Sequence, residues 1–279
     1  MDTADEGSNA NRATELIEGG ADLAGASIGA AVGLVGAPAL VVGGAAAGVV
    51  ASRMLRRMGS EIHQRLLGPR QRVRVGAAFA VAADAIATRL EAGEAPRSDG
   101  FFNSGPAGRP AAEEVLEGVL QAAGEAFEER KVPFLGKLYA SVAFDPTVGR
   151  PQANFFIAVA ERLTFRQLVL MAVISRRDAE SVAISAGGKD TPASQIHFSE
   201  KLGLEADDLE RRGLIGNGPR GSTPRPGARA FVEAGGRPVS DLSLTGPGEQ
   251  LHDLMGLQDI SEDARQEVLK DLLKLPADG

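Results

Sequence analysis

Residues 23–52 form a run of thirty residues without a charged side chain, bounded by Asp22 and Arg53. As a single α-helix this run would be about 45 Å long, which exceeds the ~30 Å hydrocarbon core of a bilayer. Pro38 lies in its middle, and a proline there kinks or breaks a helix because it lacks an amide donor. The run therefore predicts either one kinked membrane span or a hairpin of two short apolar helices.

Glycines recur at four-residue spacing inside this run, at Gly25, Gly29 and Gly33 and again at Gly44 and Gly48. This spacing places them on one helix face, where the missing side chains let another backbone approach closely. Such a glycine zipper predicts self-association, so we expect a homo-oligomer. Because Ala and Gly are weakly hydrophobic, bilayer insertion is marginal. The alternative is a soluble hairpin packed against the rest of the chain, or the core of a soluble oligomer.

Three arginines follow the run closely: Arg53, Arg56 and Arg57. Cations directly after an apolar segment are typical of a positive-inside flank or of a collar that binds lipid headgroups. Arginines on a solvated helix face would give the same pattern. The arginines thus make membrane lipids the expected partner, while the solvated face stays open as an alternative. The acidic N-terminus has no basic region of the kind that begins a secretion signal, so we expect none.

Composition limits the chemistry that the chain can perform. Cysteine is absent, which excludes disulfides, thiolate metal sites and a cysteine nucleophile. The three histidines, at positions 63, 197 and 252, are scattered. No motif of a hydrolase, a metalloprotease, a calcium loop or a phosphate loop occurs, and nothing in the sequence points to a Ser-His-Asp triad. We therefore expect a protein that is not an enzyme, with no cofactor and no metal.

The predicted fold class is mainly α, because a core of Ala, Val, Leu and Gly suits close-packed helices and aromatic residues are only 4% of the chain. We expect a helical bundle with the N-terminal apolar hairpin or span and a small winged-helix-like module at the C-terminal end. The Gly- and Pro-rich stretch 93–110 predicts a linker between an N-terminal domain, 1–92, and a body, 111–279. Periodicity predicts helices over 70–90, from Pro110 to Phe127, and over 134–144, 152–163, 165–177, 205–212 and 247–257, with a last one between Ser261 and Pro276.

The apolar positions of these helices predict the core. After Pro110 they extend from Ala112 to Phe127, and in the helix at 152–163 they include Phe155. The residues Lys131-Val132-Pro133 are expected to break the chain between two helices. Thr164 is expected to cap the helix at 165–177, whose middle is apolar nearly all round and is therefore predicted to be buried.

The order of elements after residue 200 resembles a winged-helix module. The helix at 205–212 leads into Leu214-Ile215, the Gly- and Pro-rich stretch 216–240 resembles a wing, and 241–245 predicts a strand. The acids of that helix would repel phosphates; they are Glu205, Asp207, Asp208 and Glu210. Since the net charge is also −7, nucleic acid is an unlikely partner, and we expect a structural or protein-contact role instead.

Residues 129–146 (ERKVPFLGKLYASVAFDP) resemble the W-A-N-L-L-A-N-A-x-D-P block of the bacterial abortive-infection alpha family. The segments 161–168, 209–215 and 244–248 are similar to the later conserved segments of that family. The Trp and Asn of the block are absent, and Leu135, Lys137 or Ser141 stand in their region. The resemblance covers residues 13–60 and 111–257. It implies an antiviral defence or toxin-type protein, and it transfers no catalytic residue.

Together these features predict a non-enzymatic, membrane-associated bacterial defence effector that acts by self-association or membrane insertion. Its expected location is the inner membrane, or the cytoplasm with membrane association. The alternative is a soluble regulatory module that binds DNA or a protein partner through the winged-helix-like region.

Overall fold

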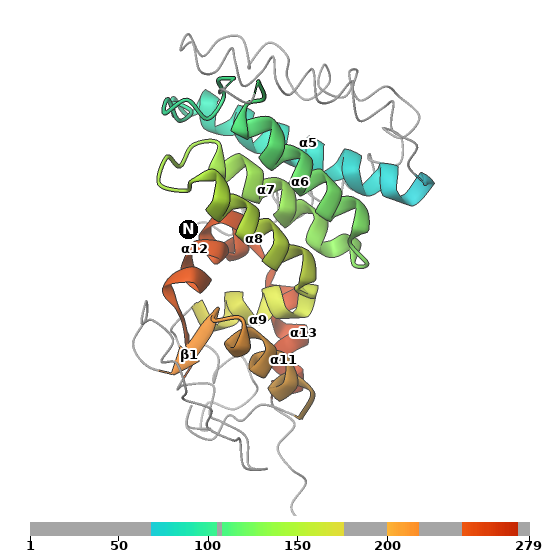
Figure 1. Cartoon of the computed structure of the whole chain (residues 1–279). Helices are drawn as coiled ribbons and strands as arrows, with labels where there is room; N and C mark the ends of the chain where they lie inside the picture. The colour runs from blue at the N-terminus through green and yellow to red at the C-terminus, as the bar shows by residue number, and fades with distance from the viewer. Residues whose placement is uncertain (1–67, 105–107, 176–199, 218–241, 273–279) are drawn as a thin grey trace, which may run out of the picture. The chain divides into compact units, whose positions relative to one another are not determined.

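The computed structural model describes residues 68–104, 108–175, 200–217 and 242–272 (Figure 1). Within these ranges the protein is mainly helical, as predicted, and has two short strands. The chain divides into two compact units, residues 1–163 and residues 164–279. The apolar run at 23–52, the three arginines that follow it and nearly all of the predicted wing lie outside the described residues. Among the helices described, none combines the length and apolar character that a bilayer span requires.

The described part of the first unit consists of helices α5 (Pro69–Glu91), α6 (Ala111–Glu125), η1 (Glu129–Lys131), α7 (Val132–Val142) and α8 (Arg150–Arg162). Helix α7 packs against α5 and α6, and α8 packs against α6 and α7. Prolines stand in the first turn of α5, α7 and α8, where a missing amide costs no helical hydrogen bond. The predicted break between two helices is present, but it lies at residues 126–131, and Val132 and Pro133 already belong to the first turn of α7.

Small residues allow α5 and α7 to approach closely. A β-carbon at Gly136 of α7 would lie 2.5 Å from the carbonyl oxygen of Ala78 and 3.0 Å from the β-carbon of Val81, both on α5. The large side chains that are fully buried in this unit include Phe79, Leu116, Leu135, Leu138, Tyr139 and Phe156. Because the chain has few aromatic residues, the close approach of two backbones fills space that large side chains would otherwise occupy.

Two aromatic residues predicted for the core are exposed. Phe127 is fully exposed, because α6 ends at Glu125 and the chain has left the helix before it reaches this ring. In α8, Phe155 is 51% exposed whereas its neighbour Phe156 is 2% exposed. A helix turns by about 100° at each residue, so only one member of an aromatic doublet faces the core.

The stretch 93–110 does not divide the structure. Helices α5 and α6, which flank it, pack against each other within one unit. Phe101 and Phe102 of this stretch are buried, and the Ala112 amide donates to the Phe101 carbonyl. Although its Gly and Pro content is typical of a linker, these contacts make the stretch a packed connection. The division lies instead between Leu163 and Thr164.

The described part of the second unit consists of α9 (Phe165–Ser175), α11 (Glu200–Arg211), β1 (Ile215–Asn217), β2 (Leu242–Leu244), α12 (Gly246–Met255), η4 (Leu257–Asp259) and α13 (Glu262–Leu272). Helix α9 is central and packs against α11, α12, α13 and β2. Its predicted burial is confirmed, and so is its cap: the Gln167 amide donates to Thr164 Oγ1 and the Thr164 amide donates to Gln167 Oε1. Strands β1 and β2 pair antiparallel, with Ile215 opposite Leu244.

Candidate functional site

The glycines and arginines singled out in the sequence lie outside the described residues, but the chain that carries them joins the fold at a defined place. Gly68 is the N-cap of α5 and the first described residue, so the preceding chain is covalently connected to α5 there. We call this region the α5 entry end. It comprises the start of α5 and the end of α6 with the turn that follows it: Gly68, Arg70, Gln71, Arg74, Gly124, Glu125, Phe127 and Glu129.

Polar contacts hold the two halves of the α5 entry end together. Arg74 donates to the Gly124 carbonyl, with its Nη2 atom at 2.6 Å, and thereby satisfies one of the last carbonyls of α6. The Gln71 side-chain amide donates to Glu125 Oε1 at 3.1 Å. Arg70 and Glu129 form an exposed ion pair at 3.5 Å. The turn after α6 is therefore fixed against the start of α5.

Phe127 projects from this fixed turn into solvent. The ring is fully exposed, and the carboxylates of Glu125 and Glu129 on either side of it bind residues of α5. A buried Phe side chain contributes roughly 1.5–3 kcal/mol relative to an exposed one, so burial of this ring against an apolar phase or partner would be favourable. Sequence periodicity assigned this ring to the core, and only the position of the helix end reveals its exposure.

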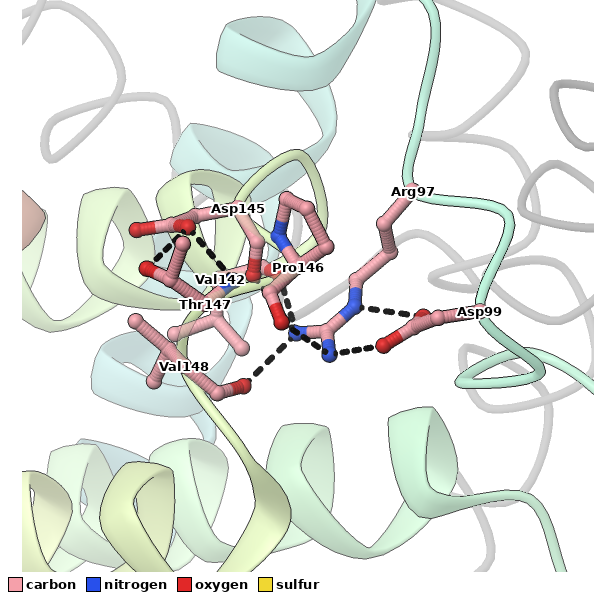
Figure 2. A network of polar contacts seen from close by, with 7 residues as sticks. All are labelled: Arg97, Asp99, Val142, Asp145, Pro146, Thr147 and Val148. Carbon is pink, nitrogen blue, oxygen red and sulfur yellow. Dashed lines mark hydrogen bonds and ion pairs between the residues drawn. The ribbon is translucent and has the colours of Figure 1, made fainter.

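Arg97 lies at the centre of a network of polar contacts (Figure 2). Its Nη1 atom donates to the carbonyls of Val142, Asp145 and Val148 at 3.2, 2.7 and 2.8 Å. Its Nε and Nη2 atoms donate to the Asp99 carboxylate at 2.9 and 2.5 Å. The hydrogen bond from Arg97 also lowers the pKa of Asp99. Because its donors are used inside the fold, Arg97 is suited to anchoring the turn between α7 and α8 rather than to binding a ligand.

Lys131 is a second buried cation with the same kind of partner. Its Nζ atom donates to the carbonyls of Ala160, Glu161 and Leu163 at 3.3, 2.5 and 2.8 Å. These carbonyls end α8, where the helix dipole favours a positive charge. Burial lowers the pKa of Lys131, against the opposing charges of nearby glutamates. Three acceptors match the three hydrogens of an ammonium group, so Lys131 serves as the C-terminal cap of α8.

A serine, a histidine and an aspartate form a hydrogen-bonded chain in the second unit. Ser175 Oγ lies 3.0 Å from His252 Nε2, and His252 Nδ1 lies 2.9 Å from Asp253 Oδ1. This order of contacts is that of a nucleophile, its base and an orienting acid. Ser175 and His252 are both buried, however, and the serine hydroxyl also bonds the Ala172 carbonyl of its own helix. The arrangement therefore fits the packing of α9 against α12 better than it fits substrate attack.

The acids of α11 are engaged by neighbouring side chains. Asp208 accepts hydrogen bonds from Arg212 Nε at 2.8 Å and from Gln167 Nε2 at 3.0 Å, and the Arg212 contact lowers its pKa. Glu205 lies 3.3 Å from Arg166 Nε. Two of the four acids expected to repel phosphates thus bind side chains of α9. One of them, Asp208, also binds Arg212, which follows the last residue of α11. The sequence alone does not show what α11 packs against, so these contacts could not be predicted from it.

Within the ranges that the structure describes, no group of three His, Asp or Glu side chains is placed as ligands of a metal ion. No protein-family model, no curated protein and no solved structure matches this chain. What the protein does must therefore be argued from its own residues.

Proposed function

We propose that the protein is a non-enzymatic, membrane-associated effector of the abortive-infection type, which acts through self-association or insertion of residues 23–52. One observation carries the proposal: thirty uncharged residues with glycines at four-residue spacing are followed closely by Arg53, Arg56 and Arg57. An apolar segment with a basic flank favours a bilayer surface, and glycines on one face favour helix association there. The family resemblance adds the defence role, and the apolar segment implies the bacterial inner membrane, or the cytoplasm with membrane association, as the location.

The described residues support this proposal in two respects. Phe127 presents an exposed ring at the α5 entry end, so this part of the first unit offers an apolar contact in addition to the run itself. The buried cations Arg97 and Lys131 contact backbone carbonyls, and the Ser175–His252 pair is enclosed by packing. These clusters favour structural roles, in keeping with an effector that makes and breaks no covalent bond.

Flotation of the full chain with vesicles tests the membrane role. The protein should float with vesicles of anionic lipid, and less with zwitterionic ones, because each cation near an anionic surface contributes about 1 kcal/mol. The double variant Arg53→Glu with Arg56→Glu should float less. The charge-matched control replaces Arg150 and Arg211, whose side chains are 52% and 73% exposed, by Glu and should float normally. Recovery of the wild-type chain only in the soluble fraction would refute the proposal.

A second candidate is a soluble regulatory module of winged-helix type. Helix α11 is followed by the antiparallel β1–β2 pair, and the residues that connect the two strands include Arg220, Arg225, Arg229 and Arg237. A helix followed by a two-stranded wing is an arrangement that places basic residues on DNA phosphates. In a gel-shift assay with the full chain, sequence-specific binding that survives about 200 mM salt would favour this candidate. Weak binding without sequence preference would favour the membrane effector.

A further inference from the structure

Helix α5 is buried around its whole circumference in its central part. Nine consecutive residues, from Val75 to Ala83, are buried. Successive residues of an α-helix point about 100° apart, so nine consecutive buried positions include every direction around the axis. A helix that covers one side of a bundle shows a polar face instead. Something therefore covers α5 on all sides.

Helices α6 and α7 account for one of those sides. They are the main helical neighbours of α5 among the described elements. Gly136 of α7 lies against Ala78 and Val81, and Gly124 of α6 lies near Val75, where an added β-carbon would be 3.3 Å from Val75 Cγ2. At 100° per residue, the side turned away from these contacts carries Gly76, Ala80, Ala83 and Ala87, which we call the far face of α5. Gly76 is buried, and Ala80, Ala83 and Ala87 are 2%, 3% and 5% exposed.

We propose that the Gly/Ala-rich segment 23–52 packs along the far face of α5 in the same molecule. The segment precedes α5 in the chain, and the fifteen residues 53–67 between them span up to about 50 Å when extended. The helix itself, with 23 residues, is about 35 Å long. The connection is therefore long enough for the segment to double back along α5.

The chemistry of the two surfaces is complementary. The segment carries no charge and presents glycines on one face, while the far face presents Gly76 and alanines. Small residues on both helices permit the close backbone approach that Gly136 and Ala78 already show on the other side of α5. Because the segment has no charged side chain, this contact would bury no unpaired charge. The docked segment holds its glycine face against α5, and self-association or insertion requires its release.

The absence of cysteine from the chain permits a clean crosslinking test. Ala80→Cys is combined, one at a time, with Gly25→Cys, Gly29→Cys, Gly33→Cys, Gly44→Cys or Gly48→Cys in the full chain. The control combines the same partners with Phe155→Cys, whose site on α8 is 51% exposed. After mild oxidation without lipid, at least one Ala80→Cys pair should give an intramolecular disulfide, seen as a monomer of altered mobility on a non-reducing gel. The Phe155→Cys pairs should give none.

Alkylation provides a second readout if Ala80→Cys disturbs folding, and Ala87→Cys then serves as the alternative far-face variant. The thiol at the far face should react with iodoacetamide at least about tenfold more slowly than that of Phe155→Cys, because reaction requires local opening. Disulfides that form only between two chains, or a far-face thiol as reactive as the control, would overturn the proposal. The test uses no lipid, so it stands or fails independently of the flotation result.

Discussion

Gly136 of α7 lies directly against the Ala78 carbonyl of α5, where a β-carbon would be only 2.5 Å from the carbonyl oxygen. The two helices cannot keep this spacing if the glycine gains a side chain. We expect Gly136→Ala to lower the free energy of unfolding by about 2 kcal/mol, as measured by urea denaturation. The control is Gly203→Ala in α11, where an added β-carbon meets no atom within 4 Å. That change should stabilise the protein by up to about 1 kcal/mol through helix propensity.

Replacing Arg97 should be among the most damaging single changes in the first unit. Arg97→Ala leaves the carbonyls of Val142, Asp145 and Val148 without their donor in a buried site. We expect a loss of about 3 kcal/mol in urea denaturation. Arg150→Ala removes an exposed contact to Glu114 and should cost less than about 0.5 kcal/mol. Equal effects of the two variants would contradict an anchoring role for Arg97.

Acid should weaken the second unit through Asp208. The hydrogen bond from Arg212 holds the pKa of Asp208 below its ordinary value of 3.8 in the folded protein. Between the folded pKa and 3.8 the unfolded chain binds more protons, so this contribution is present above pH 3.8 and is lost as pH falls through the folded pKa. Urea midpoints at neutral and acidic pH should therefore differ less for Asp208→Asn than for the wild type. Arg212→Gln should act in the same direction, because it removes the charged guanidinium that bonds Asp208.

Fluorophosphonate labelling tests whether Ser175 is a nucleophile. Because Ser175 and His252 are buried and hydrogen-bonded in helix packing, we expect no labelling of the folded wild-type chain above the level of Ser175→Ala. Stoichiometric labelling that disappears in Ser175→Ala would instead show a reactive serine and contradict the non-enzymatic proposal. The same substitution should cost about 1 kcal/mol of stability, since it removes a buried hydrogen bond to His252.

Phe127 should contribute to vesicle binding but not to folding. Its ring is fully exposed, so Phe127→Asp should change the free energy of unfolding by less than about 0.5 kcal/mol. Flotation with anionic vesicles should decrease several-fold, because the variant removes an apolar ring and adds a negative charge. Phe155→Asp makes the same change on α8, at a ring that is half-exposed. It should bind vesicles as the wild type does.

Helix positions could be predicted well from the sequence, because apolar spacing and caps are local features. The helix predicted for 70–90 is α5, Pro69–Glu91, and the Thr164 cap is present with its reciprocal Gln167 bond. The errors fall at helix ends. A shift of two residues at the end of α6 is enough to move Phe127 from the core to solvent.

The buried cations could not be found in the same way. Arg97 stands in a Gly- and Pro-rich stretch that is typical of a linker, and Lys131 stands before a proline that is typical of a break. Their partners are backbone carbonyls from 29 to 51 positions away along the chain. Every residue has a backbone carbonyl, so the sequence does not show which residues accept these hydrogen bonds. The Ser175–His252 contact was missed for a related reason, since its two partners are 77 positions apart.

These cation-to-carbonyl contacts place unequal constraints on the residues they join. Arg97, Lys131 and Arg265 each donate to a buried main-chain oxygen that would lose its donor if the side chain were replaced. The accepting positions, such as Val142 and Glu161, supply only backbone and are free to change identity wherever their side chains permit. Chains of this fold can therefore diverge widely in sequence around a few fixed basic residues. A distant relative would then be recognised by these basic residues rather than by its apolar positions.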